Sequence, residues 1–324
     1  MSRPVASLSL DLDNAWAYLK TSGDPAWETM PSYFDTVVPR ILAIKRELGL
    51  PLTVFIVGAD AEIARNVPSL KDIADAGCEI GNHSFWHEPW LHLYSREEVE
   101  EEISKAENAI HAATGVRPRA FRGPGFSISD TVLETLAARG YAYDASTFPT
   151  VIGPLARLYY FMKAPLSAEE RKTRKRMYGS ISDGFRPLKP YRWTLPASEL
   201  VEIPVTTMPL TRTPFHLSYL QYLAGFSEVL AKAYFRTALG LCKLRGIEPS
   251  FLLHPPDFLG QGEAPGLDFF PAMNRPAEKK AAFARWALST LQKHFDVVTM
   301  QQHADLVSAR ELPVADADSL RQAA

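Results

Sequence analysis

Short apolar runs alternate with longer amphipathic stretches along the 324-residue chain, and this alternation limits the folds that the chain can adopt. The apolar runs have the length of strands, whereas the amphipathic stretches place apolar residues three and four positions apart, as helices require. Strands that alternate with helices usually pack as parallel βα units. Eight strands are expected, at residues 7–11, 52–57, 79–81, 120–122, 141–143, 201–205, 251–254 and 297–299.

Helices are expected between most of these strands. Ser95 followed by Glu98 predicts a capping box at the start of one of them. Because seven or eight βα units fit into a chain of this length, the pattern favours an α/β barrel over an open sheet, in a single domain over residues 1–312. The small polar residues of 313–324 predict a flexible tail. The expected helices cover residues 33–48, 95–114, 129–139, 220–245 and 277–294.

Residues 151–200 interrupt the alternation and are interpreted as an insertion. The aromatic stretch LYYFM precedes the basic run RKTRKR, and residues 163–192 hold nine basic and three acidic residues. An apolar patch beside a cationic one would suit a lipid-linked, phosphate-bearing substrate at an anionic membrane surface. A lid or an oligomer contact with a solvated basic helix would carry the same pattern. Flotation with anionic vesicles, with the basic run intact or neutralised, separates the two interpretations.

Composition excludes several classes of protein. The hydrophobic fraction of 46% rules out a disordered chain, and a net charge of -2 lacks the basic excess that nucleic-acid binding needs. Cys78 and Cys242 lie in apolar surroundings, which favours two buried thiols in a reducing compartment. Two acidic residues occur before any signal-peptide core could form, and no apolar run approaches the length of a membrane span. We therefore expect a cytoplasmic protein, with membrane contact only at its surface.

Ionisable residues recur where the predicted strands end. In a parallel barrel the catalytic groups come from these ends, and such residues are costly to bury unless they are paired or bind a metal. The recurrence therefore predicts an active site there. Its candidate residues are Asp11, Asp13, His83, His87, Arg122, Asp144 and His254.

His83 and His87 stand four residues apart in GNHSFWHEPW, so both imidazoles can bind one cation from one side of a turn. The same spacing also arises on ordinary helix faces. A carboxylate from LDLD would complete a three-ligand site with open positions, which a catalytic Zn²⁺ requires. Such an ion acidifies bound water and polarises a carbonyl, so the set predicts hydrolysis of an amide or ester.

Five segments in order, LSLDLDN, HSFWH, FRGPGF, YDAST and LLH, resemble the motifs of the polysaccharide deacetylases, which form carbohydrate esterase family 4 and share the NodB-homology domain. The resemblance covers residues 7–150 and 201–306. It implies a distorted (β/α) barrel of about seven parallel strands. It also implies hydrolysis of N-acetyl or N-formyl groups on an amino sugar, with one divalent ion that is Zn²⁺ or else Co²⁺, Mn²⁺ or Ni²⁺.

By this resemblance His83 and His87 are metal ligands, one aspartate is the third ligand and the other is the general base. We assign Asp11 as the base and Asp13 as the ligand, with the exchanged assignment open. The family's two aspartates are adjacent, whereas Leu12 separates them here. Residues two apart in a strand share a face, so both can still reach one site. This spacing resembles that of deformylases that act on undecaprenyl-linked aminoarabinose, so a lipid-linked or exopolysaccharide precursor is a candidate substrate.

The resemblance assigns further roles to three residues. Arg122 would pair with the base and keep it ionised, His254 would be the general acid, and Asp144 would orient His254. A backbone amide of residues 84–86 would help to hold the oxyanion. The remaining histidines, His92, His111, His216, His294 and His303, are interpreted as structural or exposed.

Two other functions compete with an amino-sugar deacetylase. An allantoinase-like enzyme would hydrolyse a small amide or imide on the same fold, and a sugar-binding protein would carry a degenerate site. Allantoinase-like relatives tend to lack some of the metal ligands, whereas this chain retains a complete set of candidate ligands. Metal analysis and an Asp11→Asn variant separate the binding protein from the enzymes, because binding would not depend on the base.

Overall fold

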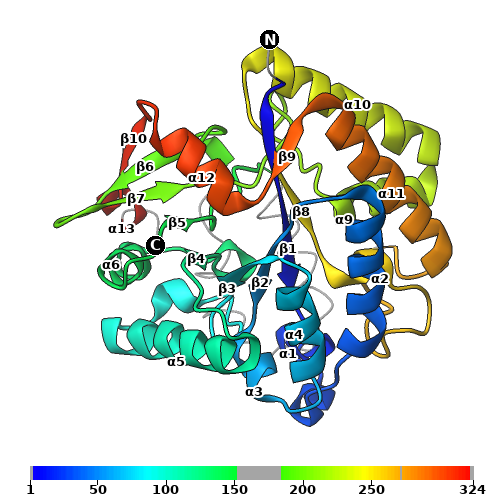
Figure 1. The fold of residues 1–324 in the computed structure, drawn as a ribbon, viewed down its shortest axis with the longest axis horizontal. Helices are drawn as coiled ribbons and strands as arrows, with labels where there is room; N and C mark the ends of the chain where they lie inside the picture. Colours follow the sequence, from blue (N-terminus) through cyan, green and yellow to red (C-terminus); the bar gives the residue numbers. More distant parts are fainter. Residues whose placement is uncertain (1–2, 152–183, 271, 322–324) are drawn as a thin grey trace, which may run out of the picture.

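A curved, mostly parallel sheet forms the centre of the structure, a computed structural model that describes residues 3–151, 184–270 and 272–321 (Figure 1). The parallel strands pair in the order β8–β1–β2–β3–β4–β5–β7. Their carboxyl ends therefore meet along one edge, where ligand sites of such sheets usually lie. The strands are β1 (Val5–Leu12), β2 (Thr53–Ile56), β3 (Glu79–Asn82), β4 (Ala120–Phe121), β5 (Tyr143–Asp144), β7 (Glu199–Glu202) and β8 (Ser250–Leu253).

Three further strands extend the sheet. β6 (Tyr191–Thr194) forms an antiparallel hairpin with β7, and β10 (Val314–Asp316) pairs with β6. β9 (Asp296–Val298) pairs with the first residues of β1. Neither β6 nor β10 was expected from the sequence, because both are short and lie in the segments interpreted as an insertion and as a flexible tail.

The expected barrel is corrected: in the described part of the chain the path of paired strands ends at β8 and β10 and does not close. The reason lies in β7, which pairs with β5 along one edge and with β6 along the other. That second edge is therefore not free to pair with β8. The chain after β7 and strand β8 approach each other only beyond the end of β7. There the amide of Thr206 donates to the carbonyl of Ser250 at 3.1 Å.

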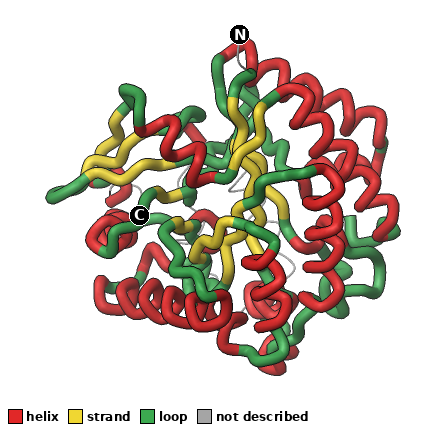
Figure 2. The backbone as a smooth tube through the Cα atoms, viewed as in Figure 1, coloured by secondary structure: helices red, strands yellow, loops and turns green. Residues whose placement is uncertain are grey.

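Helices flank the sheet, as the red and yellow segments of Figure 2 show. The Ser95–Glu98 capping box is confirmed at the start of α5. The single helix expected over 220–245 is wrong: it divides at Ser227, whose extended backbone ends α9 and whose hydroxyl caps α10. The helices are α1 (Ala15–Ser22), α2 (Phe34–Leu48), α3 (Gly58–Glu62), α4 (Val67–Asp75), α5 (Arg96–Thr114), α6 (Asp130–Ala138), α9 (Leu217–Phe226), α10 (Glu228–Arg245), α11 (Ala277–His294), α12 (Met300–Ser308) and α13 (Asp318–Arg321).

Short 3₁₀ segments complete the connections between these elements. They are η1 (Pro25–Thr29), η2 (Leu91–Leu93), η3 (Pro124–Phe126) and η6 (Pro255–Phe258). η3 and η6 lie near the carboxyl edge of the sheet, because they begin within three residues of the ends of β4 and β8.

The expected flexible tail is also corrected over most of its length. Val314–Asp316 form β10, and the side chains of Ala317 and Leu320 are buried in an apolar cluster that includes Trp193 of β6. The unpaired edge of β6 offers backbone hydrogen bonds, and burial of the two side chains adds apolar contact. Composition alone could not reveal these partners.

Part of the expected insertion, including the run RKTRKR and the aromatic stretch before it, lies outside the described residues. Its described end, residues 184–200, holds β6 and the beginning of β7. Among the helices that the structure describes, none has the length and apolar character needed to cross a membrane.

The main apolar core joins β1, β2 and β8 to the helices α1, α2, α10 and α11. Cys242 lies in this core and Cys78 at the start of β3; both are buried and unbonded to each other. Burial raises the pKa of Cys78 to about 11 and that of Cys242 to about 12. The prediction of two buried thiols is confirmed.

Candidate metal centre and proton-transfer groups

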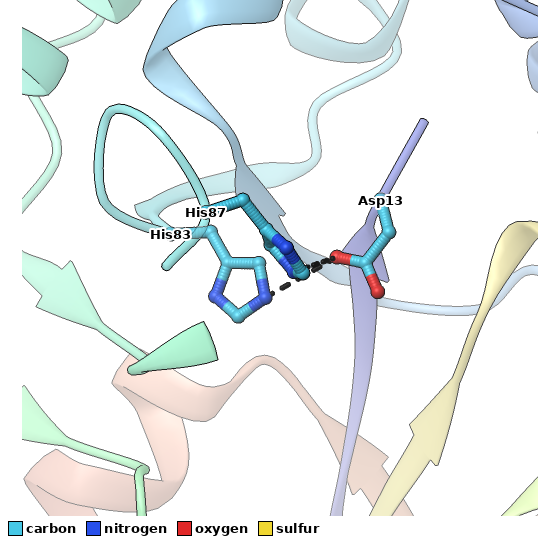
Figure 3. Close-up of side chains that lie close together, drawn as sticks. All are labelled: Asp13, His83 and His87. Carbon is cyan, nitrogen blue, oxygen red and sulfur yellow. Dashed lines mark ion pairs between the residues drawn. The ribbon is translucent and has the colours of Figure 1, made fainter. Parts of the chain in front are cut away.

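Asp13, His83 and His87 meet at the carboxyl edge of the sheet (Figure 3). Asp13 follows β1, and both histidines come from the loop after β3. The Nε2 atoms of His83 and His87 lie 3.3 and 3.1 Å from Oδ1 of Asp13, and all three side chains are buried. The structure therefore brings together the three residues that the sequence predicts as ligands.

The hydrogen bonds of these side chains fit a cation. Nδ1 of His83 lies 2.6 Å from the carbonyl oxygen of Arg122, which can only accept, so Nδ1 carries the proton and Nε2 presents its lone pair. Such a contact fixes the tautomer of a metal-binding histidine. Oδ1 of Asp13 is buried and, among the described residues, receives no hydrogen bond of good geometry. The three donor atoms lie within 4.8 Å of one another, which suits a three-ligand site.

Opposite charges within the cluster shift the pKa values of its members. Burial would raise the pKa of Asp13, but His87 and His83 outweigh it and hold that pKa well below its usual range. Burial likewise opposes a charge on His83, yet Asp11 and Asp13 outweigh it and raise the pKa of His83. The carboxylates thus make this pocket favourable for positive charge.

Glu102 of α5 holds the loop that carries the two histidines. Its Oε2 accepts hydrogen bonds from the amides of Phe85 at 2.9 Å and Trp86 at 3.0 Å. Ser84 and His87 have φ values of 59° and 53°, in the left-handed region that non-glycine residues avoid. The buried carboxylate therefore stabilises a loop shape that is unfavourable by itself.

This arrangement excludes two of the three amides that the sequence offers for the oxyanion, whereas the amide of Ser84 stays a prediction. The amides of Phe85 and Trp86 already donate to Glu102, so they do not face a substrate oxyanion. Glu102 itself was missed, because it lies on a helix among many other acidic residues and only the folded chain places it under the loop.

Asp11 lies on the other side of the cluster and pairs with Arg122. Nη1 of Arg122 lies 2.6 Å from Oδ1 of Asp11 and 2.9 Å from the hydroxyl of Ser9, and Nε donates to the carbonyl of Ala145. The guanidinium also stacks on the ring of Phe55, 4.4 Å from its centroid. Arg122 and Asp11 are therefore in the contact that the sequence predicts, and the arginine is fixed from several strands.

Asn14 and Asp60 set the turn that follows Asp13. The side-chain oxygen of Asn14 caps α1, and its amide donates to Oδ1 of Asp60 at 2.7 Å. Trp16 and Asn66 donate to the same oxygen, whereas Oδ2 of Asp60 is buried without a partner among the described residues. Burial is the main cause that raises the pKa of Asp60, to about 7.

His254 follows β8 and faces the base. Its Nε2 lies 4.0 Å from Oδ2 of Asp11, and its side chain remains 17% exposed. Nδ1 lies 3.0 Å from the hydroxyl of Ser218 on α9. The predicted acid and the predicted base therefore face one another beside the metal-ligand cluster.

The predicted contact between Asp144 and His254 is corrected. The Asp144 carboxylate accepts from the hydroxyl of Ser146 at 2.6 Å and from its amide at 3.2 Å. Burial and the neighbouring Glu202 raise the pKa of Asp144 well above its usual range. Within the described chain, Ser218 occupies the position on His254 that we had assigned to Asp144. Ser218 lies 36 residues from His254, so no local pattern could have identified it.

One wall of the site comes from the segment after β4. A Cβ on Gly123 would lie 1.9 Å from the carbonyl oxygen of Ser127, so this tight turn requires glycine. The turn places Phe126 against Phe148, with ring centroids 4.7 Å apart, and Phe148 in turn contacts His216. His216 lies 5.8 Å from the ring of His254, so this histidine belongs to the surroundings of the site.

The structure is that of a mostly parallel α/β protein with a buried cluster of two histidines and one aspartate whose arrangement could hold a metal ion. Residues 24–143 match the family described as polysaccharide deacetylase, so this segment of the chain is similar to that family. The match includes His83, His87 and Arg122, whereas Asp11, Asp13, Asp144 and His254 lie outside it.

Two curated relatives each match somewhat more than a third of the chain. A peptidoglycan deacetylase of Helicobacter pylori is 31% identical over 109 residues, which cover 34% of this chain and 36% of the relative. A peptidoglycan deacetylase-like protein of Gibberella zeae is 32% identical over 126 residues, 38% of this chain and 35% of the relative. The chain thus spans about a third of the length of the curated relatives that it matches.

Solved structures extend the likeness of fold to nearly the whole chain. A candidate polysaccharide deacetylase from Mycobacterium smegmatis superimposes with a TM-score of 0.63 at 20% identity, over 97% of this chain and 93% of the other. A 4-alpha-glucanotransferase from Thermococcus litoralis gives a TM-score of 0.57 at 13% identity, over 98% of this chain and 42% of the other. At these identities the likeness concerns the fold alone.

Proposed function

We propose that the chain is a metal-dependent hydrolase that removes an N-acyl group from an amino-sugar substrate. The observation that carries the proposal is the position of Asp11 between two groups: Arg122 at 2.6 Å and His254 at 4.0 Å. A carboxylate and an imidazole that face one another beside a metal-ligand set are the groups that hydrolysis of an amide needs.

Asp13, His83 and His87 would hold a divalent ion, which when bound polarises the substrate carbonyl and acidifies water. Asp11 accepts a proton from the attacking water, and the ion pair with Arg122 orients the carboxylate. His254 delivers a proton from Nε2 to the nitrogen of the leaving amine. The new C–O bond forms first and gives a tetrahedral oxyanion. The C–N bond then breaks as the amine nitrogen takes up the proton from His254, and the products are a carboxylate and a free amino sugar.

The relatives support an amino-sugar substrate. The Helicobacter pylori relative is named as a peptidoglycan deacetylase, and the Gibberella zeae relative as a peptidoglycan deacetylase-like protein. A further relative of Listeria monocytogenes is named as a peptidoglycan-N-acetylglucosamine deacetylase. We infer that the substrate carries an N-acetyl or N-formyl group, on a polymer or on a lipid-linked precursor.

Release of amine from an oligomer of N-acetylglucosamine tests the proposal. The chain is loaded with Zn²⁺, and free amine is measured with an amine-reactive dye while mass spectrometry identifies the acyl group that leaves. Asp11→Asn and His254→Ala should each lower kcat at least ~100-fold, because each removes a proton-transfer partner. Normal turnover by both variants would contradict the mechanism, and binding without turnover by the wild type would identify a sugar-binding protein instead.

A further inference from the structure

The corner where α9 meets α10 exposes large apolar side chains. Phe226, Val229 and Leu230 are close together in the sequence and are 76%, 76% and 68% exposed. The ring of Tyr222, which is exposed one turn earlier on α9, has its centroid 5.1 Å from that of Phe226. Single exposed apolar residues are ordinary on a protein surface, whereas a group of this kind marks an interaction surface.

The outer face of α10 continues this corner without a charge. Its exposed residues recur three or four positions apart, which places them on one side of the helix. Leu244 at the far end is 79% exposed, and a Cβ added to Gly240 would meet no other part of the described chain within 4 Å. The residues of the outer face are Val229, Ala233, Thr237, Gly240 and Leu244.

Basic residues border the outer face. The guanidinium of Arg236 lies 5.4 Å from the ring of Trp286 on α11, and the ammonium of Lys243 lies 5.6 Å from the aromatic ring that directly follows α11. Both cations therefore lie on the side of α10 that faces α11, next to the outer face. The one acidic residue of α10, Glu228, pairs with Lys232 at 2.7 Å. Since α10 holds four basic residues, its charge stays positive beyond that pair.

This pattern fits an anionic lipid surface better than a second copy of the chain. Helices that lie on a membrane place apolar side chains among the headgroups, while the lysines and arginines beside them reach the phosphates. Two copies packed through this face would meet with basic borders and no counter-charge, because Glu228 is already paired. Anionic lipids supply the counter-charge.

We propose that the α9–α10 corner, made of Phe226, Val229 and Leu230, and the outer face of α10 dock the protein on an anionic membrane. The corner enters the headgroup region, and α10 lies along the surface of the bilayer. Such docking needs no helix that crosses the membrane, in keeping with the helices of the described chain.

Rings in contact lead from this corner to the candidate active site. Phe226, Tyr222, Tyr219 and His216 follow one another with ring centroids 5.1 to 6.4 Å apart, and His216 lies 5.8 Å from His254. The docking surface is thus continuous with the surroundings of the proposed acid. An amino sugar anchored in the bilayer is the substrate class that this continuity favours, and that consequence rests on the proposed function.

Flotation with vesicles tests the docking surface without a substrate. The full chain is centrifuged through a density gradient with vesicles of phosphatidylcholine alone, or of phosphatidylcholine mixed with phosphatidylglycerol. The wild type should float with the anionic vesicles only, and less as salt rises. Val229→Gln with Leu230→Gln, and separately Arg236→Gln with Lys243→Gln, should each weaken binding at least ~10-fold.

Matched controls remove the same side chains from exposed sites elsewhere. Val116→Gln with Leu306→Gln, and Arg46→Gln with Lys71→Gln, should float as the wild type does. The proposal fails if the wild type does not float, or if either variant of the docking surface floats as strongly as the wild type. Binding through the run RKTRKR alone would give the second result, because every variant retains that run.

A fluorescent label reports whether the corner enters the lipid. Cys78 and Cys242 are buried, so an environment-sensitive dye should react with the new thiol of Leu230→Cys. Its emission should shift to the blue on anionic vesicles, whereas the dye on Leu306→Cys should not respond. An unchanged spectrum at position 230 would contradict insertion. A wild-type dimer in light scattering that Val229→Gln with Leu230→Gln makes monomeric, without flotation, would identify an interface between copies instead.

Hydrolysis provides a readout for the substrate class. The wild type should act faster on N-acetylglucosamine anchored to a lipid in anionic vesicles than on the soluble oligomer. Val229→Gln with Leu230→Gln should lose this advantage and keep the rate on the soluble oligomer. Equal rates of the wild type on both substrates would contradict a bilayer-anchored substrate. If neither is hydrolysed, the proposed function fails while flotation still decides the docking surface.

Discussion

Arg122 and Asp11 are in contact at 2.6 Å although β4 and β1 are separated in the sheet by β3 and β2. The contact is made inside the curve of the sheet, where Arg122 is fully buried. Because the same arginine also reaches Ser9 and Ala145, it joins the strands that surround the site. The position of the proposed base therefore depends on the curvature of the sheet as a whole.

Removal of the Arg122 guanidinium should destabilise the folded protein. Arg122→Met leaves the carboxylate of Asp11 buried without its cation, and the free energy of unfolding should fall by about 3–5 kcal/mol. Urea denaturation of the metal-free protein measures this. Adding Asp11→Asn to Arg122→Met should recover part of the loss, because the unpaired charge is gone. Strictly additive effects of the two substitutions would mean that the pair does not stabilise the fold by its charges.

Metal binding should depend on the three clustered residues. After equilibration with Zn²⁺ and removal of the excess, the wild type should retain about one ion per chain, as a three-ligand site does. Asp13→Ala, or His83→Ala with His87→Ala, should lose most of it in elemental analysis. His111→Ala is a suitable control because His111 is exposed on α5. Equal metal content in the ligand variants and the control would refute the site.

Glu102 should affect the metal site indirectly. Glu102→Ala removes the acceptor for the amides of Phe85 and Trp86, so the loop should lose its shape and metal affinity should weaken ~10- to 100-fold. Glu102→Gln keeps a side-chain oxygen that can accept both amides and should bind metal nearly as well as the wild type. Competition with a chromogenic chelator measures both affinities. Similar affinities for Glu102→Ala and the wild type would show that the loop does not need this support.

Asp60 should make stability depend on pH. Its pKa is about 7 in the folded chain, above the ordinary value near 4 of an unfolded carboxyl, so folding favours the protonated form. The contribution of Asp60 to the free energy of unfolding is therefore fully present below about pH 4. Up to ~4 kcal/mol of it is lost as the pH rises toward 7.

Asp60→Asn cannot ionise and retains an oxygen for Asn14, Trp16 and Asn66. Between pH 4 and 7, the metal-free variant should therefore gain stability relative to the wild type, which urea denaturation at several pH values would reveal. The exposed Asp268→Asn serves as the control. A difference in the free energy of unfolding between Asp60→Asn and the wild type that stays constant from pH 4 to 7 would contradict the raised pKa of Asp60.

Local patterns in the sequence identified much of the framework. Apolar runs predicted the strands of the parallel sheet, because a strand buried on both faces must be apolar along its length. The Ser95–Glu98 pair predicted the beginning of α5 for an equally local reason. The spacing of His83 and His87, together with LDLD, predicted three candidate ligands. The fold brings their donor atoms within 4.8 Å of one another.

Contacts between distant segments decided the rest. Whether the sheet closes depends on which strand takes the second edge of β7, and nothing near β7 in the sequence specifies that partner. Ser218 reaches His254 across 36 residues, and Arg122 reaches Asp11 across 111. Such pairs satisfy hydrogen-bonding and charge requirements of buried groups that arise only once the elements have packed. Local sequence patterns thus identified most of the elements and the types of the candidate ligands, whereas long-range packing selected the partner of each buried polar group.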